Sequence, residues 1–134
     1  MKKCKNVKLD ERVSDLLYII DLTVGKQIFR NAMVCNLHKK ENKIMIGDIL
    51  VTVNFDNQKY KRYINKGYGT LLMNQLLLFA RQNNYEQIVG NLGIADENSE
   101  YDPDHRDRQI HFYKKFGFNI LPNEKNAQYI KLFL

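Results

Sequence analysis

A glycine-rich turn ahead of a long apolar segment is the first place where this sequence could bind a ligand. Lys66 precedes Gly67 and Gly69, and leucines at helical spacing follow over residues 71–80. The first turn of a helix leaves backbone N–H groups unpaired, and the helix dipole adds about half a positive charge there. Glycines let the backbone approach an anion closely, and Lys66 adds a formal charge. The pattern indicates a phosphate site, although glycine turns of this kind also precede helices that bind no ligand.

The turn lacks the features of two common nucleotide sites. Gly-Lys-Ser/Thr does not follow at the spacing of a P-loop. The third glycine of the dinucleotide motif is missing, and no acidic residue ends the next predicted strand. Both motifs need those residues to hold their ligands. We therefore expect a ligand other than a nucleoside triphosphate or NAD.

Cysteine and histidine show no metal-ligand pattern. Cys4, Cys35 and three histidines are scattered without ligand spacing. Two cysteines are too few for a disulfide framework, so the thiols are expected to be reduced, as in the cytosol. Cys35 is predicted to be a small buried apolar residue of a strand. The sequence therefore predicts no metal site.

The net charge of +6 is unevenly distributed along the chain. Residues 1–43 carry +5, residues 44–95 carry +2 and residues 96–134 carry −1. Six acidic residues lie close together: Asp96, Glu97, Glu100, Asp102, Asp104 and Asp107. A basic body attracts polyanions and an acidic loop attracts cations. Two solvated surfaces, or two ligands of opposite charge, are both consistent with this distribution.

Length and composition predict one globular domain spanning residues 1–134. The chain is 44% hydrophobic and 27% charged, which excludes collagenous and wholly disordered classes. A chain of this length can bury a core without disulfide or metal support. The longest apolar runs, such as residues 16–20, are far too short to span a membrane. No apolar stretch follows the basic start, so no signal peptide is expected and the protein is predicted to be cytoplasmic.

The N-terminal part predicts an antiparallel meander. Residues 1–12 are polar and indicate a frayed end or a short edge strand. The β-branched and aromatic run 16–20 favours a strand, with a short helix as the alternative. Two further strands are predicted at 28–37 and 44–53. Polar turns at 23–26 and 39–42 precede them.

An irregularity is predicted inside the third of these strands. Ile44 and Ile46 set one apolar phase, whereas Ile49 begins the other, so the phase slips at Gly47-Asp48. A slip of one residue turns every later side chain to the opposite face unless a bulge absorbs the extra residue. A glycine inside a strand often marks such a bulge. The alternative is a strand that is buried on both faces.

The second half of the chain predicts a crossover and a terminal hairpin. The helix over 71–80 has a wide apolar arc, so it should be largely buried, and Asn83-Asn84 should end it. A strand over 88–94 could then pair parallel to the third strand. A second helix over 105–116 and a hairpin of 118–121 with 127–134 complete the chain.

At its second motif the sequence resembles the GNAT superfamily of acetyl-coenzyme A-dependent N-acyltransferases. That family pairs a Gly-x-Gly turn opening a helix with a downstream Tyr-x-x-x-Gly-Phe. The latter is Tyr113-Lys114-Lys115-Phe116-Gly117-Phe118 in this chain. The resemblance extends from Ile44 to the C-terminus. It implies a mixed α/β fold with a mostly antiparallel sheet, in which the meander, the βαβ crossover, a helix and a hairpin follow in order.

The resemblance also implies residue roles. The pyrophosphate of coenzyme A would be held by the loop Asn65, Lys66, Gly67, Tyr68, Gly69 and Thr70. The pantetheine arm would pair with the third strand near Val51 and Val53, where that strand splays from the next. A backbone amide just past the bulge would polarise the thioester carbonyl. Tyr113 would protonate the departing thiolate, although it could instead be a core tyrosine.

Several positions depart from the family pattern. Ile64 stands where the family has Gln or Arg, and Lys61 or Arg62 are the candidates to replace that phosphate contact. Arg106 and Gln109 stand where Asn and Ala are common. The usual pair of N-terminal helices is predicted to be reduced or absent. Those helices form one wall of the acceptor site in the family, so the acceptor class does not follow from the resemblance.

An amine acceptor must lose a proton, so the reaction needs a base, directly or through water. Asp48 is the first candidate because a bulge could aim it into the cleft, although a solvated carboxylate is the alternative. His105 and His111 are of the residue type that suits a base at neutral pH, but they cannot both lie on one side of a helix. The acidic loop 96–104 could recruit a cationic acceptor or could simply be solvated.

The resemblance therefore predicts an acyltransferase that moves an acetyl group from acetyl-CoA to a primary amine by direct attack in a ternary complex. The acceptor is expected to be a small-molecule or peptide amine, most simply a cationic one. The alternative is a non-catalytic acyl-CoA-binding or regulatory domain. Nucleic acid and membrane partners are not expected, because no reader motif accompanies the basic residues. The sequence leaves open whether the protein forms a homodimer.

Overall fold

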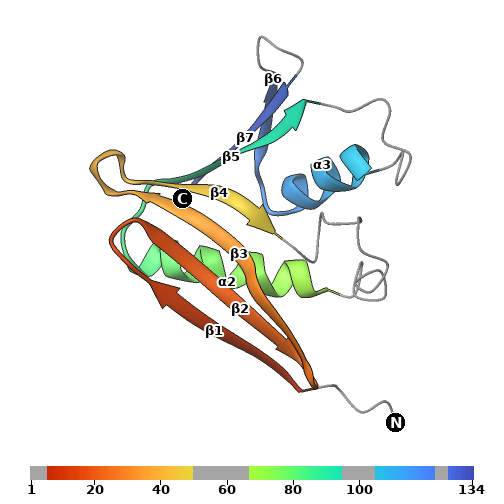
Figure 1. The fold of residues 1–134 in the computed structure, drawn as a ribbon. Coiled ribbons are helices and arrows are strands. Elements are labelled where there is room, and N and C mark those ends of the chain that lie inside the picture. The colour runs from red at the N-terminus through yellow and green to blue at the C-terminus, as the bar shows by residue number, and fades with distance from the viewer. Residues whose placement is uncertain (1–5, 50–66, 95–104, 123–126) are drawn as a thin grey trace.

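The computed structural model describes residues 6–49, 67–94, 105–122 and 127–134 (Figure 1). The elements follow in the order β1 (Val7–Val13), β2 (Leu17–Val24), β3 (Gln27–His38), the 3-10 turn η1 (Lys39–Glu41), β4 (Lys43–Ile49), α2 (Tyr68–Gln82), β5 (Gln87–Ile94), α3 (His105–Lys115), β6 (Asn119–Pro122) and β7 (Ala127–Phe133). The predicted mixed α/β fold is confirmed. Every predicted strand and helix is present, with ends shifted by a few residues or lying outside the described ranges.

The seven strands form one sheet in the order β1-β2-β3-β4-β5-β7-β6. Strands β1 to β4 are a meander, because each pairs antiparallel with the next. Strand β5 pairs parallel with β4 after the chain has crossed over through α2. The terminal hairpin of β6 and β7 joins the sheet by pairing β7 antiparallel with β5. The crossover therefore connects two antiparallel units at the centre of the sheet.

The alternation of burial along β2 explains why residues 17–24 form a strand rather than a helix. Tyr18, Ile20, Leu22 and Val24 are buried, and Leu17, Ile19 and Thr23 between them are partly exposed. A period of two fits a strand and not a helix. Tyr18 stacks on Phe79 of α2 with ring centroids 3.9 Å apart. The strand thus presents one apolar face to the helix.

Helix α2 packs into the core through the wide apolar arc that its sequence predicted. Its buried residues are Leu72, Met73, Leu76, Leu77, Phe79 and Ala80. The helix ends at Asn83, whose side-chain amide donates to the carbonyl of Phe79 at 2.8 Å. The buried core contains residues of both helices and of strands β2, β3, β4, β5 and β7, and it includes Tyr113 of α3 and Ile130 of β7. No described helix is long and apolar enough to cross a membrane.

Strand β1 passes to β2 through only Ser14, Asp15 and Leu16. The hydroxyl of Ser14 accepts a hydrogen bond from the backbone N–H of Leu17, and the N–H of Ser14 donates to the carbonyl of Leu17. No helix precedes β2 in the described residues from Asn6 onward. The predicted reduction of the N-terminal helices therefore agrees with this part of the structure.

A buried carboxylate organises an irregularity between β2 and β3. Ile20 faces Met33 and Leu22 faces Phe29, so Asp21 alone lies opposite three residues of β3. One of these, Asn31, has a left-handed backbone with φ 55°, and its N–H donates to Asp21 Oδ1 at 2.8 Å. Asp21 also accepts from Nε and Nη2 of Arg12 at 3.2 and 3.0 Å. The carboxylate thus stabilises the bulge that these three residues form in β3.

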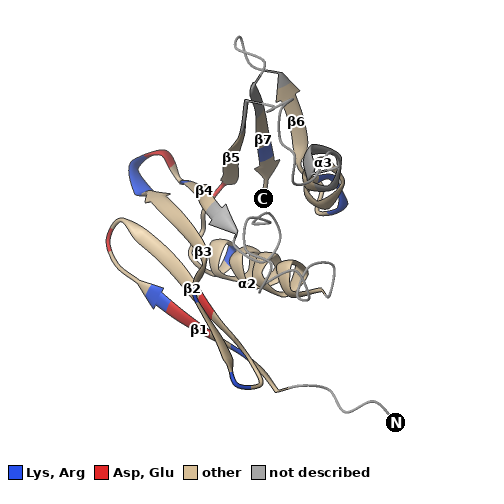
Figure 2. Cartoon of the chain, turned by 45° about the vertical axis from the view of Figure 1, so that its right-hand side comes forward, with Lys and Arg blue, Asp and Glu red and all other residues tan. Residues whose placement is uncertain are grey.

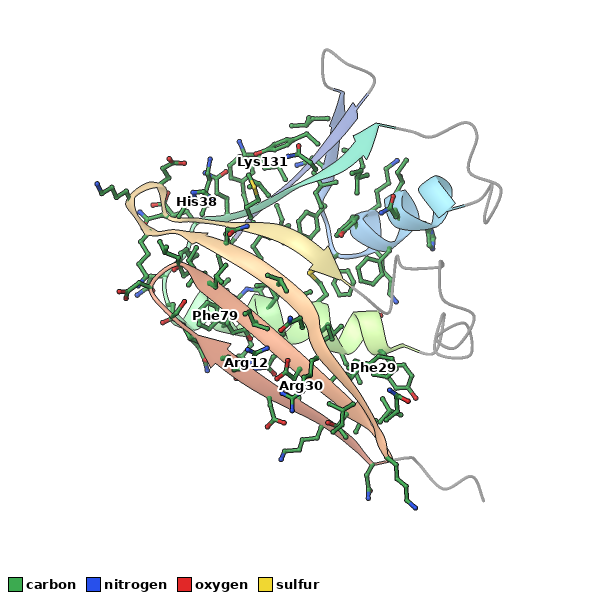
Figure 3. All side chains as sticks on the ribbon, viewed as in Figure 1. Arg12, Phe29, Arg30, His38, Phe79 and Lys131 are labelled. Carbon is green, nitrogen blue, oxygen red and sulfur yellow. The ribbon has the colours of Figure 1, made fainter. Side chains whose placement is uncertain are left out.

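The pKa of Asp21 lies below its usual value even though the side chain is buried. Burial by itself raises the pKa of a carboxyl group, because it disfavours the charge. The N–H of Asn31, the hydrogen bonds and charge of Arg12, and the charge of Arg30 outweigh that effect. Arg12 and Arg30 lie near each other over the β1–β3 part of the sheet (Figure 3). The ionised form of Asp21 therefore stabilises the fold.

We predict that Asp21→Asn lowers the free energy of unfolding by about 1–3 kcal/mol near neutral pH, since it removes a charged acceptor of several hydrogen bonds. A carboxyl group with a lowered folded pKa stabilises the protein above its unfolded pKa of about 3.9, and the effect is lost as the pH falls through the folded pKa. The difference between wild type and Asp21→Asn, measured by urea unfolding, should therefore shrink in acid. Asp15→Asn, at a fully exposed carboxylate, should leave stability unchanged. A difference that grows in acid would contradict the assignment.

Candidate functional site

The two central strands separate at their carboxyl ends. Strands β4 and β5 are paired from Lys43↔Gln87 to Ile46↔Gly90. Beyond these pairs β4 continues to Ile49 and β5 to Ile94, and Figure 1 shows the two strands diverging there. The divergence leaves backbone N–H and C=O groups of β4 without a β5 partner. In open α/β sheets, ligands bind outside the carboxyl ends of parallel strands where the connections diverge.

A bulge lies in β4 at this divergence. Cys35 faces Ile46 and Val34 faces Asp48, so Gly47 is an extra residue on β4. A Cβ atom at Gly47 would lie 3.1 Å from the backbone carbonyl oxygen of Val34, which explains why this position carries glycine. The predicted bulge at Gly47-Asp48 is confirmed. It also accounts for the slip in the apolar pattern, because Ile49 lies opposite Met33, a core residue of β3.

Helix α2 begins at the residue after Gly67, whose φ of 87° places it in the left-handed region. A Cβ atom there would touch nothing within 4 Å, so the backbone angle, and not space, favours glycine. Gly67 at the N-cap has no side chain with which to cap the first turn, and the described residues of that turn include no acidic one. Because α2 runs back from the end of β4 to the start of β5, its first turn lies toward the carboxyl ends of the two strands. Its N–H groups and dipole favour an anion at that end.

A cation from the second helix reaches the same turn. Lys115 of α3 places its Nζ 3.4 Å from Oγ1 of Thr70, the third residue of α2. A positive charge beside a helix N-terminus is unfavourable by itself, and an anion held between the two would relieve it. This contact was not predictable from the sequence, because Lys115 and Thr70 are 45 residues apart. Lys115 nevertheless stands inside the second motif that the sequence singled out.

The end of α3 explains the spacing of that motif. The N–H of Gly117 donates to the carbonyl of Lys114, and the N–H of Phe118 donates to that of Tyr113. These two bonds form a Schellman cap, which needs a left-handed residue, and Gly117 has a φ of 92°. The cap turns Phe118 back onto Tyr113, with ring centroids 5.4 Å apart. Tyr-x-x-x-Gly-Phe is therefore the sequence of a helix end that fixes the position of Tyr113.

Comparisons with known proteins agree with this geometry. No family model matches the sequence. A segment of 81 residues is 33% identical to the uncharacterized protein YocC of Bacillus subtilis (strain 168) and covers 60% of this chain, but the match spans only 39% of YocC. A GNAT-family acetyltransferase from Staphylococcus aureus superposes with a TM-score of 0.58 at 12% identity, over 88% of this chain and 68% of that one. The chain has the GNAT fold. The resemblance predicted from the two motifs is thus confirmed at the level of the fold.

A second solved structure has nearly the same extent as this chain. The Bacillus subtilis acetyltransferase in complex with CoA matches with a TM-score of 0.57 and 16% identity, over 97% of this chain and 99% of that one. An acetyltransferase with a fold and extent similar to those of this chain therefore binds CoA.

The structure brings some of the predicted residues of the GNAT site together. Gly67, Tyr68, Gly69 and Thr70 form the start of α2, next to Lys115. Tyr113 lies on the buried side of α3, 4% exposed, between Phe112 and Phe118. That burial fits both interpretations of Tyr113, as an acid or as a core residue. The backbone of Asp48 lies at the bulge, opposite Val34.

Other predicted positions lie outside the described residues. These are Val51, Val53, Lys61, Arg62, Ile64, Asn65, Lys66 and the acidic loop 96–104. The side chains of Asp48, His105 and Arg106 are not described either, although their backbones belong to β4 and α3. Their roles stay predictions.

Of the remaining candidates, His111 is exposed on α3. Cys35 is fully buried in β3, as the sequence predicted, and burial raises the pKa of its thiol to about 12. A thiol with so high a pKa is a poor nucleophile at neutral pH. Among the described residues no three His, Cys, Asp or Glu side chains are grouped so that they could bind a metal.

We predict that Gly47→Ala lowers the free energy of unfolding by about 1–3 kcal/mol, because the added methyl group meets a backbone carbonyl in a paired strand. Urea unfolding would measure the decrease in the free energy of unfolding, and the m-value should stay unchanged. Asn36→Ala, at an exposed neighbour of the bulge, is the matched control and should have a small effect. A Gly47→Ala variant as stable as the wild type would show that the bulge tolerates a side chain.

Proposed function

We propose that the protein is an N-acyltransferase that moves an acetyl group from acetyl-CoA to a primary amine. The observation that carries the proposal is the meeting of three features at the carboxyl ends of the two central strands. These are the divergence of β4 from β5, the bulge at Gly47 and the first turn of α2, which starts at a glycine and has Lys115 beside it. The GNAT fold and the CoA complex of a structural neighbour support the same conclusion.

In this proposal the phosphates of CoA bind at the start of α2. Backbone N–H groups of the loop 65–70 would donate to the pyrophosphate, as the helix N-terminus favours. The Nζ of Lys115 already lies 3.4 Å from Thr70 Oγ1 and would supply a positive charge at the same end. Since Ile64 stands in place of the family's Gln or Arg, Lys115 is a candidate for the missing phosphate contact.

The acyl group would lie at the bulge. The pantetheine arm would pair with the free edge of β4, toward Val51 and Val53. An extra residue in a strand leaves one N–H out of the regular ladder, so the bulge at Gly47 offers a donor for the thioester oxygen. Such a donor stabilises the negative charge that develops on that oxygen when the amine attacks.

Proton transfers complete the proposed reaction. The amine nitrogen forms a bond to the acetyl carbon and loses a proton to a base, for which Asp48 is the candidate, directly or through water. The C–S bond breaks, and the departing thiolate takes a proton from the phenol of Tyr113. A phenol suits this step because its ordinary pKa of about 10 lies above that of a thiol. The Schellman cap at Gly117 holds the helix end that carries Tyr113.

The acceptor in this proposal is a cationic small molecule or peptide amine. Five acidic residues of the loop 96–104 precede α3 directly and would attract such an acceptor: Asp96, Glu97, Glu100, Asp102 and Asp104. The three-residue link between β1 and β2 leaves the N-terminal side without helices in the described residues. A binding domain without turnover is therefore the alternative that the experiments must separate.

Binding of the coenzyme is tested first. Acetyl-CoA should raise the melting temperature of the wild type, because a ligand that binds only the folded state stabilises it. Lys115→Met should weaken CoA binding about tenfold by titration calorimetry, as expected for one lost charge-assisted contact. Lys114→Met removes the same charge one residue earlier on α3 and is the matched control. No thermal shift with the wild type would refute the proposal, and equal affinities of the two variants would remove Lys115 from the site.

Turnover is tested with Tyr113→Phe. We expect this variant to bind CoA like the wild type but to lose about 100-fold or more in kcat, the usual contribution of a general acid. Release of free CoA thiol with a panel of polyamines, aminoglycosides, amino acids and peptide N-termini measures the rate. Tyr85→Phe, at a partly buried tyrosine packed on Phe79, controls for loss of a phenol elsewhere. Full activity of Tyr113→Phe at neutral pH would refute the acid role, and CoA binding without turnover of any amine would favour the binding domain.

A further inference from the structure

The sheet has two edges, and one of them could accept another strand. Strand β6 has only four residues and ends in Pro122, which cannot donate a ladder hydrogen bond. Strand β1 has seven residues, from Val7 to Val13, and pairs only with β2 among the described strands. Its outer row of N–H and C=O groups is therefore a template for a further strand.

The charges of β1 fall into two groups. Glu11 accepts a hydrogen bond from Tyr18, and Arg12 binds Asp21, so both are engaged inside the subunit. Lys8 and Asp10 bind only each other among the described ion pairs, at 3.7 Å, and their side chains are 73% and 53% exposed. Figure 2 shows charges of both signs along β1. Lys8 and Asp10 are thus an exposed pair of opposite charges on one face of the edge.

These charges select one register for a second copy of the same strand. Side chains and hydrogen-bonding groups alternate with period two, so an antiparallel pair of identical strands must be centred on a residue. Centred on Asp10, the register of longest overlap, Asp10 would face itself and Lys8 would face Arg12. Centred on Glu11, Asp10 would face Arg12 twice, but Glu11 would face itself and Arg12 is already bound to Asp21. Centred on Leu9, Lys8 faces Asp10 of the other copy twice and Leu9 faces Leu9.

We propose that β1 pairs with β1 of a second copy, antiparallel and centred on Leu9, so that two sheets join into one across a two-fold axis. The occupant is a second copy because, in this register and in none of the others, the strand pairs opposite charges with itself and places no like charges opposite each other. The two Lys8–Asp10 pairs become a network of four alternating charges. On the other face of the strand the partly buried Leu9 gains apolar cover from Leu9 of the second copy, and Val7 lies opposite Glu11. The interface is independent of the proposed coenzyme site, since three strands, β2, β3 and β4, lie between β1 and β5.

Charge reversal followed by exchange tests this register. The mass of the wild type in solution, measured by light scattering and sedimentation over a wide concentration range, should rise to that of a dimer. Lys8→Glu or Asp10→Lys alone places like charges opposite each other twice and should raise the dimer dissociation constant about tenfold or more. The double variant Lys8→Glu/Asp10→Lys restores opposite charges and should restore the dimer. Lys114→Glu, with the same charge change on α3, should dimerise like the wild type.

The outcomes are distinct. Melting curves of all variants confirm that each is folded, so a loss of dimer is not a loss of structure. A wild type that stays monomeric at every concentration overturns the proposal and leaves the charges as a device that keeps the edge unpaired. A dimer that neither single reversal weakens uses another surface. Single reversals that weaken the dimer without rescue by the double variant overturn the register centred on Leu9.

Discussion

Strand β4 has two different partners, and that constraint organises the rest of the structure. Along one edge it pairs antiparallel with β3, and along the other it pairs parallel with β5. The parallel partner requires a crossover, so α2 must return from the end of β4 to the start of β5. The first turn of α2 is thereby brought to the carboxyl ends of the strands, where the bulge and the divergence also lie. The position of the candidate site follows from this topology.

Three glycines permit this arrangement, for two different physical reasons. Gly47 avoids a contact with the carbonyl of Val34 and so permits the bulge. Gly67 adopts a left-handed backbone where α2 begins, and Gly117 does so where α3 ends. The last of these also sets the contact between Tyr113 and Phe118. Short motifs can therefore identify the fold at very low overall identity, because each glycine records a backbone geometry that other residues adopt at a cost.

The fold was largely predictable from the sequence, and the errors are informative. The apolar pattern predicted β2 to β5 and α2, and the phase slip predicted the bulge at Gly47. Whether residues 15–21 form a strand or a helix stayed open, because five apolar residues fit both; pairing with β1 and β3 decided it. The bulge of β3 at Arg30 to Ala32 was not predicted. Its cause is Asp21, ten residues away, whose carboxylate holds Asn31 in a left-handed conformation.

The sequence by itself determined the elements, the turn residues and the two motifs, because these depend on periodicity and on local backbone conformation. It also placed Gly67 to Thr70 and Tyr113 among the candidate site residues. Only the tertiary structure brought Lys115 to Thr70, Arg12 to Asp21 and Phe118 onto Tyr113. The first two contacts each join two different helices or strands, and the third depends on the helix cap at Gly117. Charge and hydrophobicity along a chain state what each residue can do, but distances between residues are set by how the strands pair and the helices pack.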